Sequence, residues 1–147
     1  MVNPDGVIIG NTRTSTAGKD LNRQFLLANK DIYPEVSLVK EFAKKLHYHS
    51  EIFLYLDFHG HSKKKNTFCY GPSFSLGEPN YYKSRIFPKL IEKLDSNFRY
   101  HSCNFAIEDE KKQTARGVLF EQLKINFTYT IETSIGYFYN SEQSKTF

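Results

Sequence analysis

A histidine and a glutamate, each near the end of an apolar run of strand length, are the first candidates for chemistry in this sequence. His59 stands in the string Asp-Phe-His-Gly-His-Ser at 57–62, directly after the apolar run 52–56. In open α/β sheets, ligand sites gather beyond the carboxyl ends of the strands, and a neutral imidazole is a good zinc ligand. We therefore predict that His59 binds a metal ion. A structural role is the alternative for a single histidine.

Glu132 ends the run Tyr-Thr-Ile at 129–131. A carboxylate that closes a buried strand is costly unless it is paired or takes part in a reaction. Beside a metal-bound water it could act as a general base. Asp57 shares a strand face with His59 and could orient its imidazole, or it could make a structural hydrogen bond. We expect His61 to support the site or to face substrate rather than to bind metal.

Two arginines and an asparagine in the turn-rich N-terminal segment could bind a carboxylate. They are Arg13, Asn22 and Arg23. The planar guanidinium matches a carboxylate in bidentate fashion, and a neighbouring amide adds a directional donor. An exopeptidase that reads a free C-terminus needs such a clamp. A solvated surface position is the alternative for each arginine.

The elements that must position these residues alternate between helix and strand. Apolar residues at 39, 42 and 46, with lysines opposite, predict a helix over 35–49. Strands are predicted at 52–56, 67–71 and 127–132, and further helices at 80–95 (kinked at Pro88) and about 114–123. An extended segment is predicted at 98–103 and a charged loop at 108–113. The N-terminal segment is predicted to form two loops around an extended piece at 7–9. This alternation favours an α/β fold with a mixed β-sheet flanked by helices.

Composition narrows the classes of protein. The chain has 147 residues, which is enough for one domain. Its net charge of +4 gives a weak preference for anionic partners. No stretch has the length of a membrane helix, and no signal peptide is recognisable. Cys69 and Cys103 are interpreted as two reduced thiols. No nucleic-acid-binding signature accompanies the positive charge, so we expect neither nucleic acid nor a membrane as partner.

Five motifs, in order and at similar spacing, resemble the zinc carboxypeptidases. They are Asn-Pro-Asp-Gly at 3–6, Asp-Leu-Asn-Arg at 20–23, Asp-Phe-His-Gly-His-Ser at 57–62, Thr-Ala-Arg at 114–116 and Tyr-Thr-Ile-Glu at 129–132. The third, with its following lysines, and the fourth look like the cytosolic carboxypeptidases, which trim glutamates from tubulin. The resemblance implies that residues 1–138 are the C-terminal part of a catalytic domain with a partial zinc-carboxypeptidase fold. Residues 139–147 would be a polar tail.

The resemblance also implies a role for each candidate residue. His59 would be the third ligand of a Zn²⁺ cofactor, Glu132 the general base, and Arg13 the group that polarises the scissile carbonyl and stabilises the oxyanion. Asn22 and Arg23 would grip the terminal carboxylate of the substrate, and Arg116 would favour a C-terminal glutamate. The lysines at 63–65 could attract an acidic tail. We expect His59 and Glu132 to converge on one pocket lined by Arg13, Asn22 and Arg23.

The implied parent activity is hydrolytic removal of C-terminal glutamate from proteins such as polyglutamylated tubulin, in the cytoplasm and in association with microtubules or cilia. The family's first two zinc ligands form an H-x-x-E pair, which occurs nowhere in this sequence. Catalytic zinc uses three protein ligands and a water. We therefore expect the isolated chain to be inactive and to bind zinc weakly. The alternative function is a non-catalytic module that binds acidic protein tails through Arg23, Arg116 and the lysines.

Overall fold

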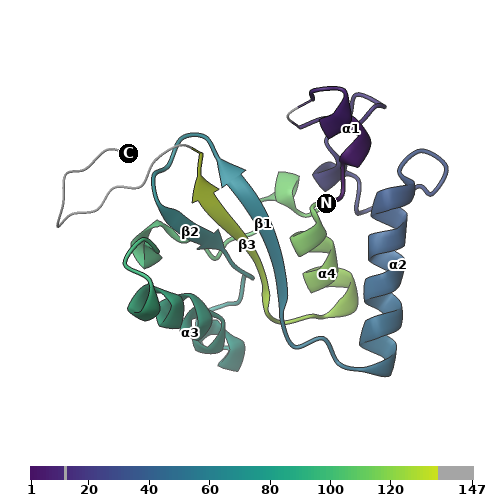
Figure 1. Ribbon diagram of the computed structural model, residues 1–147. Coiled ribbons are helices and arrows are strands. Elements are labelled where there is room, and N and C mark those ends of the chain that lie inside the picture. Colours follow the sequence, from purple (N-terminus) through teal and green to yellow (C-terminus); the bar gives the residue numbers. More distant parts are fainter. Residues whose placement is uncertain (12, 136–147) are drawn as a thin grey trace. The chain divides into compact units, whose positions relative to one another are not determined.

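The computed structural model describes residues 1–11 and 13–135, and these form two compact units (Figure 1). The first unit contains Met1–Phe53 and Glu108–Ile125. The second contains Leu54–Ile107 and the described residues from Asn126 onward. The predicted polar tail at 139–147 lies outside the described residues.

The first unit begins with a short helix where the sequence predicts an extended piece, so the prediction for residues 7–9 is wrong. Helix α1 spans Pro4–Ile8. The Asn3 side chain caps it by accepting the Gly6 N–H at 3.2 Å, and Pro4 at the first helical position already has the required φ. Gly6 is needed here because a Cβ would come within 2.6 Å of the Thr14 carbonyl oxygen.

Helix α2, Pro34–His49, confirms the predicted helix but buries a different face. The buried residues are Val36, Ser37, Lys40 and Ala43, whereas Phe42 is 67% exposed. The Lys40 ammonium donates to the carbonyl oxygens of Phe25 at 2.9 Å and of Leu26 at 3.0 Å. Burial lowers the pKa of Lys40. This lysine therefore faces the interior of its unit because it satisfies two loop carbonyl groups.

The rest of the first unit consists of 3₁₀ turns and one further helix. These elements are η1 (Leu21–Arg23), η3 (Asp109–Lys111) and α4 (Ala115–Leu123). Helix α4 confirms the helix predicted at about 114–123, and it lies beside α2 (Figure 1). The predicted loop at 108–113 contains the turn η3.

The second unit is built on a three-stranded mixed sheet, which confirms the predicted fold class. Strands β1 (Tyr55–His61), β2 (Thr67–Tyr70) and β3 (Thr128–Ser134) lie in the order β1-β3-β2. Strand β3 is parallel to β1 and antiparallel to β2. Helix α3, Pro79–Leu94, confirms the predicted helix at 80–95 and contains Pro88.

Three segments of this unit differ from the sequence predictions. Strand β1 begins at Tyr55 and continues through Gly60 to His61, because Gly60 and His61 still pair with β3. His59 therefore lies within a strand and not beyond its end. Glu132 is likewise internal to β3, which continues to Ser134. The segment predicted to be extended at 98–103 contains a 3₁₀ turn, η2, at Tyr100–Ser102.

The main hydrophobic cluster of the second unit lies on one face of this sheet. Cys69, Phe98, Tyr129 and Ile131 form its buried cluster, and Phe87 and Ile91 of α3 pack against it. The Tyr129 hydroxyl donates to the Ser84 carbonyl oxygen at 2.7 Å, which ties β3 to α3. Since side chains alternate along a strand, the residues between these apolar ones point to the opposite face. Among the described residues, no helix has the length and apolar character that crossing a membrane requires.

Candidate active site

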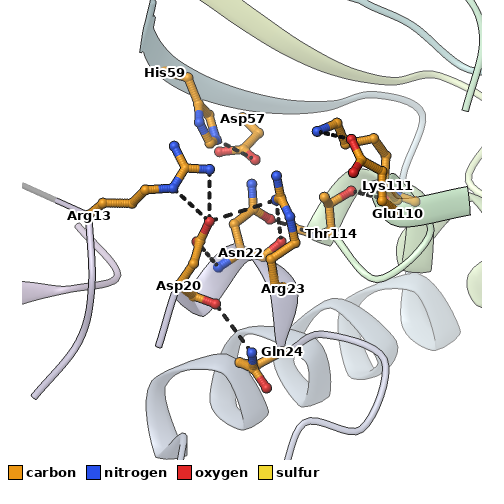
Figure 2. Close-up of polar contacts among 12 residues, drawn as sticks. Arg13, Asp20, Asn22, Arg23, Gln24, Asp57, His59, Glu110, Lys111 and Thr114 are labelled. Carbon is orange, nitrogen blue, oxygen red and sulfur yellow. Dashed lines mark hydrogen bonds and ion pairs between the residues drawn. The ribbon is translucent and has the colours of Figure 1, made fainter. Parts of the chain in front are cut away.

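The opposite face of β1 carries an acid–imidazole pair. Asp57 and His59 are two positions apart, so their side chains share a face. The His59 Nε2 and Asp57 Oδ2 atoms are 2.9 Å apart (Figure 2). Asp57 therefore contacts the imidazole, as either of the two roles considered for it requires. If the proton is on Nε2, the acceptor lone pair is on Nδ1, the nitrogen then able to bind a metal ion.

Glu132 lies directly beside His59 in the sheet. The two residues are register partners in the parallel pairing of β1 with β3, and adjacent strands are about 4.8 Å apart. Side chains of register partners point to the same face, and Glu132 is half-buried there. The structure thus places these two predicted site residues on neighbouring strands of one unit, with Asp57 as a third polar group on that face.

His61 has a structural role at the end of β1. Its Nδ1 accepts the backbone N–H groups of Lys63 at 3.1 Å and Lys64 at 2.9 Å. Its ring packs edge-to-face on Phe68, with the ring centroids 5.1 Å apart. The Lys64 ammonium lies 4.6 Å from the centroid of the same Phe68 ring. His61 therefore fixes the turn that presents the exposed lysine run.

In the first unit, both predicted anion-binding arginines interact with one carboxylate, Asp20. Arg13 donates through Nε to Asp20 Oδ2 at 2.9 Å, and its Nη2 atom lies 2.8 Å from the same oxygen (Figure 2). Arg23 Nη1 lies 3.9 Å from that oxygen. Asp20 Oδ1 also accepts the Asn22 N–H at 2.9 Å. Asp20 was not among the site residues predicted from the sequence, although its place before Leu-Asn-Arg was a usable signal.

Asn22 connects η1 to the first turn of α4. Its side-chain carbonyl oxygen accepts the Ala115 N–H at 2.9 Å, while the Thr114 hydroxyl accepts the Gly117 N–H at 3.2 Å. Both donors belong to the helix terminus, where N–H groups have no intrahelical partner. Arg116 follows in α4 and is only 4% exposed. Asn22 thus holds the Thr-Ala-Arg segment in addition to any contact that its amide makes with a ligand.

Replacing Asn22 with alanine should therefore destabilise the chain by about 1 kcal/mol, because one N–H of α4 loses its acceptor. The free energy of unfolding from urea titration measures this change. Asn22→Asp is the matched control, since it retains an oxygen acceptor at the positive end of the helix. Equal stability of Asn22→Ala and the unmodified chain would contradict a capping role.

The residues of the described segments do not complete a zinc site. Catalytic zinc takes three protein ligands, and within residues 1–11 and 13–135 no group of three or more His, Cys, Asp or Glu side chains could hold a metal ion. His59, oriented by Asp57, has the chemistry of one ligand.

The fold is that of the metallo-carboxypeptidases. A metallo-carboxypeptidase from Burkholderia cenocepacia aligns with a TM-score of 0.74 at 22% identity, over 90% of this chain and 34% of that chain. A metallo-carboxypeptidase from Pseudomonas aeruginosa, solved with (2-guanidinoethylmercapto)succinic acid, aligns with a TM-score of 0.72 at 25% identity, over 90% of this chain and 35% of that chain.

Sequence comparison narrows this class to one group. Cytosolic carboxypeptidase 2 of Mus musculus is 42% identical over 137 residues, which are 92% of this chain and 16% of the mouse protein. The Homo sapiens protein of the same name is 39% identical over 92% of this chain and 15% of its own length. Cytosolic carboxypeptidase 3 of Bos taurus is 40% identical over 91% of this chain and 14% of its own length. No protein-family model matches the chain.

The chain is thus similar over most of its length to the cytosolic carboxypeptidases and has a metallo-carboxypeptidase fold, so the resemblance stated from its motifs is confirmed. It spans about one sixth of the length of the mouse relative that it matches, 16%. The individual roles assigned to its site residues stay predictions.

Proposed function

We propose that this chain contributes to a zinc metallocarboxypeptidase that removes C-terminal glutamate from acidic protein tails, such as those of polyglutamylated tubulin. The observation that carries the proposal is the Asp57–His59 pair, with its 2.9 Å contact, beside Glu132 on the next strand. A metal ligand held by a carboxylate and a neighbouring general base are the parts that such a hydrolase needs. A cytoplasmic location with microtubule or cilium association follows from this substrate.

In this proposal the second unit supplies the reacting groups. Asp57 accepts a hydrogen bond from the Nε2–H group of His59, which leaves the Nδ1 lone pair as the one that binds the metal. Bound zinc would act as the Lewis acid of the reaction. Glu132 accepts a proton from the attacking water and later donates it to the leaving amine. Glu132 is half-buried, so the residue is partly shielded from solvent.

The first unit supplies the groups that recognise an acidic substrate. Arg13 and Arg23 outnumber the single carboxylate of Asp20, so this cluster retains one positive charge for an anion. Asp20 holds the Arg13 guanidinium, and the Asn22 carbonyl oxygen accepts from Arg23 Nη1 at 3.0 Å. Both groups are therefore positioned before a ligand arrives, which lowers the entropy lost on binding. We assign Arg13 to the carbonyl oxygen, Asn22 and Arg23 to the terminal carboxylate, and Arg116 to the glutamate side chain.

The proposal is tested with a chimera of the mouse relative. In this chimera the aligned 137-residue segment of the mouse protein is replaced by the corresponding segment of this chain. We expect this chimera, loaded with zinc, to release glutamate from a peptide that ends in several glutamates, and amidation of the C-terminus to prevent release. The 147-residue chain alone should bind zinc weakly and release nothing, because one candidate ligand does not make a tight site. A folded, zinc-loaded chimera that leaves the free peptide intact would refute the function.

A non-catalytic function, binding of acidic tails, is the second candidate. The exposed run Lys63–Lys65, fixed by the His61 hydrogen bonds, favours it. Fluorescence anisotropy of a labelled polyglutamate peptide with the unmodified chain separates the two candidates. Binding that persists in a chelator and is lost at high salt, together with an inactive chimera, would establish the binding function instead.

A further inference from the structure

Two cysteines that are distant in sequence have neighbouring sulfur atoms in the second unit. Cys69 lies in β2 and Cys103 follows the turn η2, 34 positions later. Their Sγ atoms are 3.5 Å apart, with the Cys69 thiol donating to Cys103. The Cys69 backbone N–H also donates to Cys103 Sγ, at 3.3 Å. Neither residue is in a disulfide.

The backbone around the two thiols has the separation that a disulfide requires. Tyr70 and Asn104 form a parallel bridge, and the Asn104 N–H donates to the Cys69 carbonyl oxygen at 3.0 Å. Cys69 and Cys103 each precede one partner of this bridge, so they are lateral neighbours on paired segments. Paired segments lie about 4.8 Å apart, which falls within the roughly 4.4–6.8 Å between the Cα atoms of disulfide-linked residues. The bond can therefore form with little movement of the backbone.

We propose that Cys69 and Cys103 form a redox-sensitive dithiol, a modification site at which hydrogen peroxide drives formation of an intramolecular disulfide. The two thiols differ in accessibility, since Cys103 is half-buried whereas Cys69 is fully buried in the core cluster. Peroxide therefore reaches Cys103 first. Cys69 is the resolving thiol, already in contact with the sulfur that it must attack.

The surroundings of Cys103 favour its thiolate, which is the nucleophilic form. The hydrogen bond from the Cys69 thiol is the main cause of a lowered pKa at Cys103, and the Cys69 N–H and the nearby Lys64 also lower it. Desolvation and Glu92 act in the opposite direction. The Cys103 sulfur accepts two hydrogen bonds, which the thiolate keeps. Its own thiol donates to the Arg99 carbonyl oxygen at 3.6 Å, and this bond is lost when the proton leaves.

The reaction proceeds in two balanced steps. The Cys103 thiolate attacks one peroxide oxygen, the O–O bond breaks, and hydroxide leaves to give a sulfenic acid. The Cys69 thiolate then attacks the sulfenic sulfur, the S–O bond breaks, and the oxygen leaves as water with the proton lost by Cys69. Two thiols are oxidised by two electrons in total, and one peroxide is reduced to the level of water.

The test uses the unmodified chain treated with a small excess of hydrogen peroxide. We expect the intact mass to fall by two hydrogen atoms with no change in oligomeric state, and a non-reducing digest to contain one peptide pair joining Cys69 to Cys103. Dithiothreitol should restore the original mass. In Cys69→Ser the resolving thiol is absent, so Cys103 should accumulate as a sulfenic acid that dimedone traps.

Three results would overturn the proposal. They are addition of oxygen to Cys103 of the unmodified chain without loss of the two hydrogens, disulfide-linked dimers as the main product, and equal rates of alkylation of the two thiols in the folded chain. The mass measurement needs no substitution, so it decides the question even if a serine variant fails to fold.

Discussion

Replacing Glu132 with glutamine is expected to lower the rate of C-terminal glutamate release by about 10²- to 10⁴-fold in the chimera described above, the usual range for loss of a general base. Glutamine has nearly the same shape but cannot accept the proton of the attacking water. Because the change removes a group that acts in the transition state, kcat should fall while KM stays nearly constant. Initial rates of glutamate release at several peptide concentrations separate the two constants.

The control for this substitution is Glu121→Gln, an exposed position on α4 where the same chemical change should leave the rate unaltered. Zinc content is measured for both variants, because Glu132 is assigned to proton transfer and not to metal binding. If Glu132→Gln retains the rate of the parent chimera, the carboxylate is structural. Loss of zinc from this variant alone would instead make Glu132 a ligand or a support of one.

The three longer helices, α2, α3 and α4, could be predicted because their signals are local, whereas the short helix α1 was predicted as an extended segment. The α4 cap Thr114 and the first-turn Pro34 of α2 stand next to the residues that they organise. The buried face of α2 could not be predicted, since Lys40 faces inward only because loop carbonyl groups of Phe25 and Leu26 lie there. The spacing of apolar residues predicted helix α2 but not which of its faces is buried.

The extent of β1 could not be predicted because a partner far along the chain sets it. Gly60 is a plausible end for a strand, yet its pairing with Thr133 continues the ladder. The same non-local pairing makes His59 and Glu132 neighbours. His59 and Glu132 could be selected as candidates from their residue types. That they lie opposite each other on paired strands is visible only in the structure. The contact between Cys69 and Cys103 is hidden in the same way, because a bridge between Tyr70 and Asn104 creates it.

The cluster of Arg13, Arg23 and Asp20 could be predicted only in part. Arg13 and Arg23 could be selected as anion-binding residues from their type and place in the motifs. Their shared partner Asp20 could not be selected in the same way, because a carboxylate offsets part of the positive charge that an anion-binding site needs. A substrate carboxylate must therefore compete with Asp20 for the guanidinium groups or share them.

Phe98→Ala is expected to lower the free energy of unfolding by about 3–5 kcal/mol, the usual range for truncating a fully buried phenylalanine. Phe98 is 1% exposed and packs in the cluster with Cys69, Tyr129 and Ile131. Its backbone is held by the bridge to Thr67 and by a hydrogen bond from its own N–H to the Asp95 carbonyl oxygen. The surrounding segment therefore cannot easily collapse into the cavity. Urea unfolding followed by far-UV circular dichroism measures the change.

Phe58→Ala is the matched control, because Phe58 belongs to the same unit and is 74% exposed. Its truncation should cost no more than about 1 kcal/mol, the span of intrinsic strand preferences. Equal losses for the two variants would mean that the cluster around Phe98 does not form the core of this unit. The position of Glu132 beside His59 would then lose its support as well, since Tyr129 and Ile131 of that cluster fix the strand that carries Glu132.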